Sequence, residues 1–197
     1  MTNNDINFID ENTIEILRSE LIRYLNQIET LETLSPEILF IFNSNFKNNL
    51  PITPLNEKSS QVIENNLILD FNYTDTVSRY MLDLDKNKYN HIQIHGNLNE
   101  EKSIVFGYGD EVDSNYDDIE NLNNNEFFKH IKSFNYLKDS KYIEMARLVE
   151  SKEPFEVYVF GHSLGLSDRT LLNFIFESKN MLSLKFYYYK RPDETTD

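Results

Sequence analysis

The chain has 197 residues, of which 33 are acidic and 19 are basic, and its formal net charge is −14 at pH 7. Such a charge repels phosphate backbones, so we expect no nucleic-acid partner. Cysteine is absent, which excludes disulfides and thiolate metal ligands. The length predicts one compact domain over residues 1–197, with a helical part at 12–60 and a sheet-containing part at 66–190.

The apolar residues are spread along the chain in short runs. No run approaches the roughly 18 residues of a membrane-spanning helix. The first residues, MTNNDINFIDEN, lack the basic region and apolar run of a signal peptide. We therefore expect a cytoplasmic protein with no membrane partner.

The N-terminal part is predicted to be helical. Apolar residues recur at helical spacing over 12–33, which predicts a helix with Asn12 as its cap. Ser35 precedes a proline and is the expected cap of a second helix, over 35–46. Residues 47–60 are polar, contain two prolines and are predicted to form a loop.

Short apolar runs alternate with helical patterns in the rest of the chain. The runs predict strands at 66–71, 91–94, 103–106, 155–160 and 182–189. Helices are predicted at 74–84, at 126–150 with a break near 139–140, and at 168–177. Residues 110–125 are acidic and rich in Asn, which predicts a loop. This alternation is typical of an α/β fold, a mostly parallel sheet with helices on both faces.

Polar residues follow three of the predicted strands. These loops are Asn72–Thr74, His95–Asn97 and Gly161–Ser163. Ligands of parallel sheets bind at the carboxyl ends of the strands. We therefore expect the three loops to form a polar cleft.

The sequence GHSLG, residues 161–165, fits the G-x-S-x-G pattern of a serine esterase with Ser163 as nucleophile. In that fold the catalytic histidine follows the serine along the chain. None of the four histidines follows Ser163. A tight turn that passes close to a neighbour or a ligand is the favoured interpretation, and the esterase remains an alternative.

Two further patterns resemble metal sites. His91 and His95 are four residues apart, which on a strand is about 13 Å, too far to chelate one ion. His91 is expected to be an exposed residue at the start of a strand. Residues 113–117 have the alternate acidic spacing of a calcium loop, but Asp118 and Asn124 stand where that loop needs Gly and Glu. We expect a solvated acidic loop and no metal.

Four segments together resemble the bacteriophage abortive-infection AbiH family. They are FNYTDTVSRY at 71–80, HIQIHGNL at 91–98, IVFGYGDE at 104–111 and VFGHSLGLSDRTLL at 159–172. The resemblance covers about residues 12–189. It implies a role in bacterial defence against phage, with a phage component as a candidate partner.

That family is in turn similar to Rossmann-like, sirtuin-like domains, in which an Asn and a His before Gly flank the nicotinamide ribose of NAD. The resemblance implies that Asn72 and His95 are catalytic and that NAD is a candidate substrate. It implies a second, cofactor-binding group: Tyr73, Gly96, Gly161, Ser163 and Asp168. If the protein is an enzyme, it is expected to cleave NAD at the nicotinamide–ribose bond.

Two departures from the family pattern affect these expectations. Thr74 stands where the Asn motif usually has an acid, and Asp75 follows it. Family members usually begin with a strand and a Gly-rich turn, whereas Gly96 is the first glycine here. The first βα unit is therefore expected to be missing, which would expose a sheet edge. A complementary protein segment or a homo-oligomer are the candidate partners for that edge, and a non-catalytic interaction module is the third functional alternative.

Overall fold

The computed structural model describes residues 11–28, 34–43, 66–84, 89–107, 116–121, 127–138 and 140–187. The chain divides into two compact units, Met1–Ile104 (unit 1) and Val105–Asp197 (unit 2). Among the described helices, none has the length and apolar character needed to cross a membrane.

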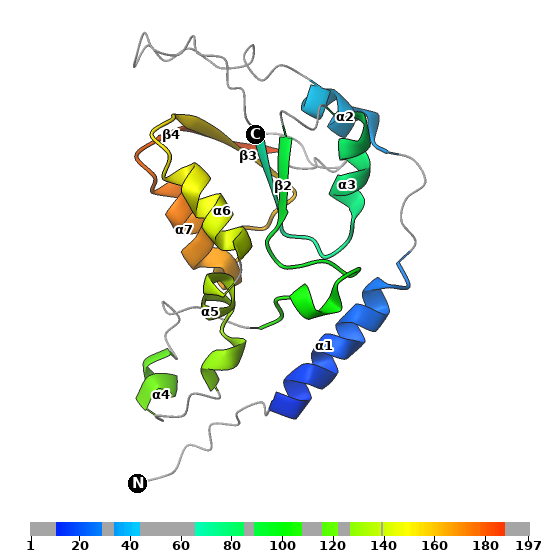
Figure 1. The fold of residues 1–197 in the computed structure, drawn as a ribbon, viewed down its shortest axis with the longest axis vertical. Helices are drawn as coiled ribbons and strands as arrows, with labels where there is room; N and C mark the ends of the chain where they lie inside the picture. The colour runs from blue at the N-terminus through cyan, green and yellow to red at the C-terminus, as the bar shows by residue number, and fades with distance from the viewer. Residues whose placement is uncertain are drawn as a thin grey trace, which may run out of the picture. The chain divides into compact units, whose positions relative to one another are not determined.

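The described part of unit 1 contains α-helices, a parallel pair of strands and short 3-10 turns (Figure 1). In chain order these are α1 (Glu11–Leu25), α2 (Pro36–Asn43), β1 (Asn66–Asp70), α3 (Thr76–Tyr80), η2 (Met81–Asp83), β2 (Tyr89–Gln93) and η3 (Glu101–Ser103). Strands β1 and β2 pair in parallel, with Asn66 opposite Tyr89 and Asp70 opposite Gln93. The pairing brings both carboxyl ends to one edge of the sheet.

Helix α1 confirms the predicted N-terminal helix but differs at both ends. It begins at Glu11, so Asn12 lies inside the helix and is not its cap. It ends at Leu25, and the N–H groups of residues 27 and 28 bond to carbonyls only three residues back, which tightens the last turn. The predicted stretch at 29–33 lies outside the described residues. Arg18 donates from the helix to the carbonyl of Glu101.

Helix α2 confirms the predicted cap. The hydroxyl of Ser35 accepts a hydrogen bond from the N–H of Ile38 at 3.4 Å, as an N-cap does. The phenol oxygen of Tyr80 accepts from the N–H of Ser35 at 2.8 Å, and Tyr89 donates to the carbonyl of Phe42 at 2.7 Å. These bonds connect α2 to α3 and β2. The loop predicted at 47–60 lies outside the described residues.

The prediction of a strand at 103–106 is wrong. Ser103 ends η3, and residues 104–107 pair with no strand in the described part of the chain. Ser103 is held instead by its neighbours, because its N–H and its hydroxyl both donate to the carbonyl of Glu100. The apolar run is nevertheless buried, since Ile104 is 6 % exposed. Burial without a partner strand explains why its composition suggested a strand.

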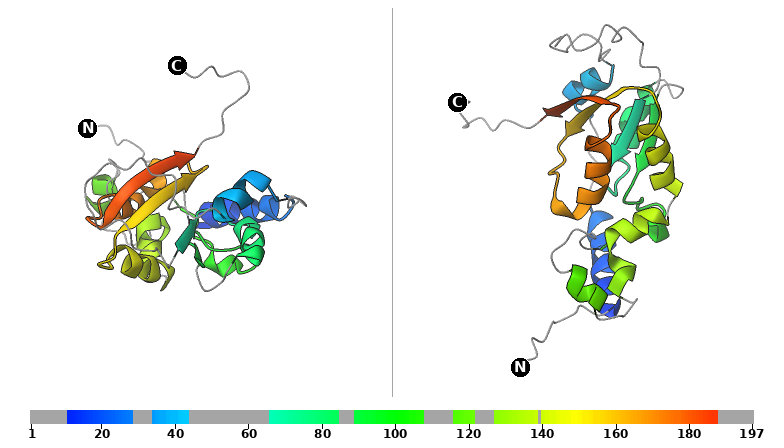
Figure 2. Two further views of the ribbon diagram at one scale, coloured as in Figure 1. Left: turned by 90° about the horizontal axis from the view of Figure 1, so that it is seen from above. Right: turned by 90° about the vertical axis from the view of Figure 1, so that its left-hand side faces the viewer.

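Unit 2 places helices beside a second parallel pair, which Figure 2 shows as two adjacent strands. Its elements are α4 (Tyr116–Asn121), η4 (Phe127–His130), α5 (Lys132–Leu137), α6 (Ser140–Val149), β3 (Phe155–Phe160), η5 (Leu166–Asp168), α7 (Arg169–Phe176) and β4 (Met181–Tyr187). Helices α6 and α7 contact each other through the rings of Tyr142 and Phe174, whose centroids are 6.0 Å apart.

The helix predicted at 126–150 has two interruptions. The break expected near 139–140 is confirmed between α5 and α6, and a second lies at Ile131, whose backbone is extended. The side chain of Ile131 is also buried, at 2 % exposed. The prediction of a loop at 110–125 is wrong for residues 116–121, because they form α4. Its other residues, 110–115 and 122–125, lie outside the described part.

Each unit has its own apolar core. The most deeply buried side chains are Ile94 in unit 1 and Ile131, Met145 and Leu171 in unit 2. The α/β class with parallel strands is confirmed, with one two-stranded parallel sheet in each unit of the described chain in place of the continuous sheet that was expected.

Candidate functional site

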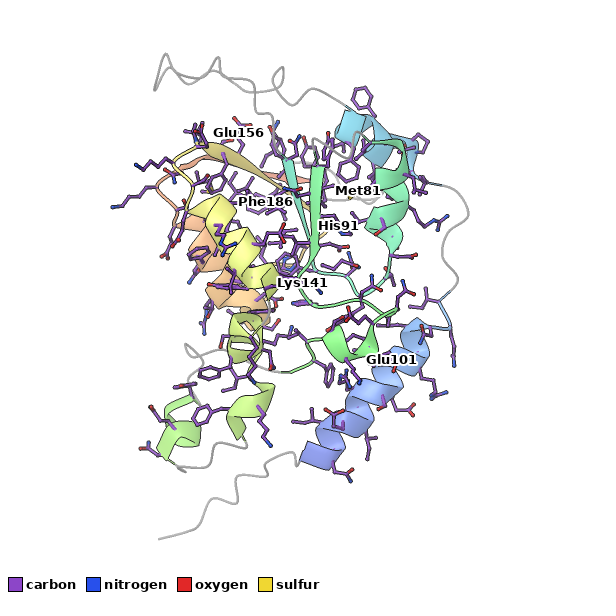
Figure 3. All side chains as sticks on the ribbon, viewed as in Figure 1. Met81, His91, Glu101, Lys141, Glu156 and Phe186 are labelled. Carbon is purple, nitrogen blue, oxygen red and sulfur yellow. The ribbon has the colours of Figure 1, made fainter. Side chains whose placement is uncertain are left out.

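Asp70, at the carboxyl end of β1, organises the first predicted loop. Its carboxylate is buried, with the residue 3 % exposed, and Oδ1 accepts from the backbone N–H of Asn72 at 2.9 Å and from Nδ2 of Asn72 at 3.0 Å. Oδ2 lies 3.2 Å from Nε2 of His91, which Figure 3 labels on β2. His91 pairs with Ile68 in mid-strand and its side chain is 15 % exposed. The prediction that His91 is an exposed strand-start residue is therefore wrong, because the buried carboxylate holds it.

The loops after β1 and β2 are joined by hydrogen bonds. Nε2 of Gln93 donates to the carbonyls of Asn72 at 3.3 Å and Thr74 at 2.8 Å. The N–H of Leu98 donates to the carbonyl of Tyr73 at 3.1 Å. Parallel pairing brings the two strand ends together, and these bonds fix one loop against the other. The predicted meeting of the Asn72 loop with the His95 loop is thus present in unit 1.

His95 is buried against the Asn72 loop. The side chain is buried, with the residue 5 % exposed, and lies against the rings of Phe71 and Tyr73, with centroids 5.4 and 5.8 Å away. Its Nδ1 is 3.0 Å from the carbonyl oxygen of Phe71. A carbonyl only accepts, so Nδ1 carries the proton of this bond. In the neutral ring Nε2 is then the basic nitrogen.

Gly96 occupies a position that a side chain cannot fill. Its φ is +87°, a left-handed conformation that glycine adopts without steric cost. A Cβ built there would overlap the backbone of Ser103. The glycine therefore lets the chain turn directly after His95 and pass close to η3. This supports a structural role for Gly96 at the edge of the candidate site.

The GHSLG loop in unit 2 differs from a nucleophile elbow. In an elbow the serine sits on a sharp, strained turn from strand to helix. Here β3 ends at Phe160 and η5 begins at Leu166, and the strained φ of 52° is at Leu164, next to Ser163. Ser163 is exposed, and the described residues offer its hydroxyl no hydrogen-bond partner. Gly161, with φ 62°, makes the turn.

Asp168 is the centre of a buried polar cluster in unit 2. It is 7 % exposed, and Oδ1 accepts from the hydroxyl of Tyr136 at 2.8 Å and lies 3.4 Å from Nζ of Lys132. Oδ2 accepts from Ser167 at 3.2 Å and lies 3.9 Å from Nε2 of His162. A buried carboxylate needs such partners to offset its desolvation. Asp168 therefore joins η5 to α5 and to the GHSLG loop.

The structure adds residues that the sequence reasoning missed. Asp70 and Gln93 connect the two loops of unit 1, and Lys132 and Tyr136 hold Asp168 in unit 2. Asp70 could have been noticed in the sequence, because it ends the apolar run NLILD and a charged group at a buried position needs a partner. Among the described residues no three His, Asp or Glu side chains could hold a metal ion. The candidate calcium loop at 113–117 is largely outside them.

Comparison with known proteins gives one family. A model of the family described as "Bacteriophage abortive infection AbiH" matches residues 3–189, nearly the whole chain. Searches of curated proteins and of solved structures gave no match. The four sequence segments quoted above, which resemble this family, lie within the matched range. The chain therefore belongs to the bacteriophage abortive infection AbiH family.

Proposed function

We propose that this protein acts in abortive infection through a nucleotide-type site built on Asn72 and His95, and that the site cleaves NAD at the nicotinamide–ribose bond. Family membership indicates the role in defence against bacteriophage. The fold class is consistent with a Rossmann-like or sirtuin-like domain, in which ligands bind beyond the carboxyl ends of parallel strands. Asn72 and His95 both follow such ends.

The observation that carries the proposal is the hydrogen bond from Nδ1 of His95 to the carbonyl of Phe71. It orients the ring and leaves Nε2 as the base, the state that proton abstraction requires. Burial between aromatic rings limits the freedom of the imidazole. Asn72 lies between the two residues whose rings contact His95, and it is exposed.

The chemistry follows from these two side chains. A water molecule attacks the ribose carbon that bears nicotinamide, a C–O bond forms, and the C–N bond to nicotinamide breaks. Nε2 of His95 accepts the proton that the water loses, and the products are nicotinamide and ADP-ribose. Nδ2 of Asn72 donates to Asp70, so its amide oxygen orients the water or the ribose hydroxyls. Tyr73 and Gly96 complete the proposed contacts in unit 1.

The loop after β3 in unit 2 is a second part of the proposal. Gly161 and Ser163 are exposed at the carboxyl end of β3, where ligands of parallel strands bind, and they are the residues of unit 2 proposed to contact a nucleotide. Asp168 is proposed to act through the loop, because its carboxylate holds Ser167 and faces His162.

The test is phage plating on bacteria that express the full chain or its variants. His95→Asn keeps an N–H near the position of Nδ1 but has no basic nitrogen, and Asn72→Ala removes the amide. The matched control is Asn99→Ala, the same change at an exposed residue of a neighbouring turn. We expect protection to be lost in the first two and kept in the control. Full protection by His95→Asn at equal protein level would refute the proposed role of this site.

A further inference from the structure

Unit 2 contains a cavity of about 350 Å³, and the described residues that line it all belong to this unit. It lies among α4, α5, α6 and α7. Its walls include four aromatic rings, those of Tyr116, Phe134, Tyr136 and Tyr142. The volume is at the lower end of the roughly 300–1,000 Å³ found for ligand pockets. That size suits a small molecule and excludes a folded peptide.

Ser133 supplies a polar group in this apolar wall. It lines the cavity, is 8 % exposed, and its hydroxyl has no hydrogen-bond partner among the described residues. Buried hydroxyls in native proteins are nearly always paired, because an unpaired one loses its hydration without compensation. A ligand with a donor or acceptor at this position would restore the missing bond.

The walls also indicate the charge and shape of the ligand. The described lining residues carry no ionisable side chain other than tyrosine phenols. The nearby carboxylate of Asp168 is engaged by the hydroxyl of Tyr136 and by Lys132, so its charge is already balanced within the protein. Rings of Tyr and Phe favour a flat partner that stacks or packs edge to face.

We propose that this cavity binds an uncharged, planar aromatic molecule that carries a neutral hydrogen-bonding group, with Ser133 as the anchor. The rings of Phe134 and Tyr142 give stacking surface. The hydrogen bond from Tyr136 to Asp168 fixes the third ring. The inference does not depend on NAD cleavage, because none of the described residues that line the cavity is among those proposed to contact NAD.

Three probes separate the elements of this proposal. Benzamide has the planar ring and the neutral amide, cyclohexanecarboxamide has the same amide on a puckered ring, and benzoate has the planar ring with a charge. Binding to the full-length protein is measured by saturation-transfer NMR and by calorimetry. We expect benzamide to bind and the other two to bind at least about fivefold more weakly, the effect of losing one favourable contact. No benzamide binding, or equal binding of cyclohexanecarboxamide, would overturn the proposal.

Variants then locate the site. Ser133→Ala should weaken benzamide about fivefold, the usual effect of losing one hydrogen bond to a neutral group. It should not lower the melting temperature, because the hydroxyl it removes has no partner in the described protein. Phe134→Leu keeps the apolar character but removes a ring, and should also weaken benzamide. Ser151→Ala, outside the cavity wall, is the matched control and should bind benzamide like the wild type.

The same experiment distinguishes this inference from the proposed function. The loss of benzamide affinity caused by Ser133→Ala should also be seen when that change is made in the His95→Asn variant. If His95→Asn abolishes binding while Ser133→Ala does not, benzamide binds at the unit 1 site and the proposal for the cavity is wrong. Unchanged affinity in both Ser133→Ala and Phe134→Leu would also refute it.

Discussion

The side chain of His95 bonds to the backbone of Phe71 across two loops that are 24 residues apart in sequence. Nδ1 and the carbonyl oxygen are 3.0 Å apart. The bond has two effects. It attaches the turn after β2 to the turn after β1, and it sets the tautomer of a buried imidazole. A second set of hydrogen bonds, from Asn72 to the carboxylate of Asp70, holds the turn after β1.

Asp70 is the first target for a stability test. Asp70→Ala removes the acceptor of two bonds from Asn72 and leaves His91 without its carboxylate. We expect the free energy of unfolding to fall by about 2–4 kcal/mol, as for loss of one partner from a buried polar pair. Asp75→Ala is the control, because that residue precedes α3 without a side-chain cap bond. Urea denaturation measures both, and equal losses would contradict the buried network.

Replacing each of the three glycines of the candidate loops with Ala should destabilise the protein by a different amount. Gly96→Ala should destabilise most, by about 3 kcal/mol or more, because the methyl group would overlap the backbone of Ser103 and the φ is positive. Gly161→Ala has the same φ problem in open space and should cost about 1–2 kcal/mol. Gly165→Ala meets only Ser163 Oγ at 3.5 Å and should be tolerated. Thermal unfolding gives the order, and a larger loss for Gly165→Ala than for Gly96→Ala would contradict the close approach of Gly96 to Ser103.

The hydrogen bond between Tyr136 and Asp168 predicts that substitutions at these two residues, which are 32 apart in sequence, affect stability in a coupled way. Tyr136→Phe should cost about 1.5–3 kcal/mol, since it removes a hydrogen bond to a buried carboxylate. Tyr24→Phe on the exposed side of α1 should cost almost nothing. In a double-mutant cycle with Asp168→Asn, the two changes should be non-additive by about 1 kcal/mol or more. Strict additivity would mean that the hydroxyl and the carboxylate do not interact.

Ser163 allows a direct test of the esterase alternative. An activated serine reacts with a fluorophosphonate probe, whereas an ordinary exposed serine does not. The strained backbone lies at Leu164, and no described side chain hydrogen-bonds the Ser163 hydroxyl. We therefore expect no labelling of the wild type beyond that of Ser163→Ala. Labelling that disappears in Ser163→Ala would restore the hydrolase interpretation.

Local sequence patterns predicted the helices and strands whose position follows from apolar runs or from the spacing of apolar residues. Strand β3 matches the predicted 155–160, because a continuous apolar run after a proline has few alternatives. The meeting of the Asn72 and His95 loops followed from parallel pairing alone. The same reasoning failed at 103–106, where an apolar run is buried without a partner strand in the described chain, and at Ile131, where an extended residue interrupts a helical pattern.

The polar partnerships could not be predicted in the same way. His91 meets Asp70 only because the register places His91 opposite Ile68, and a shift of one residue would turn it to the other face. Tyr136 meets Asp168 across 32 residues of chain. Such contacts depend on how helices pack, which no spacing within one segment encodes. They are also the contacts that set the geometry of the candidate residues.

The most direct test of the proposed site is the release of nicotinamide from NAD by the purified full chain, compared with its His95→Asn variant. If Nε2 of His95 is the base, the wild type should release nicotinamide and the variant should be slower by about 100-fold or more. Circular dichroism and the melting temperature should show that the variant remains folded. No release by the wild type, or equal rates for both proteins, would contradict the assignment.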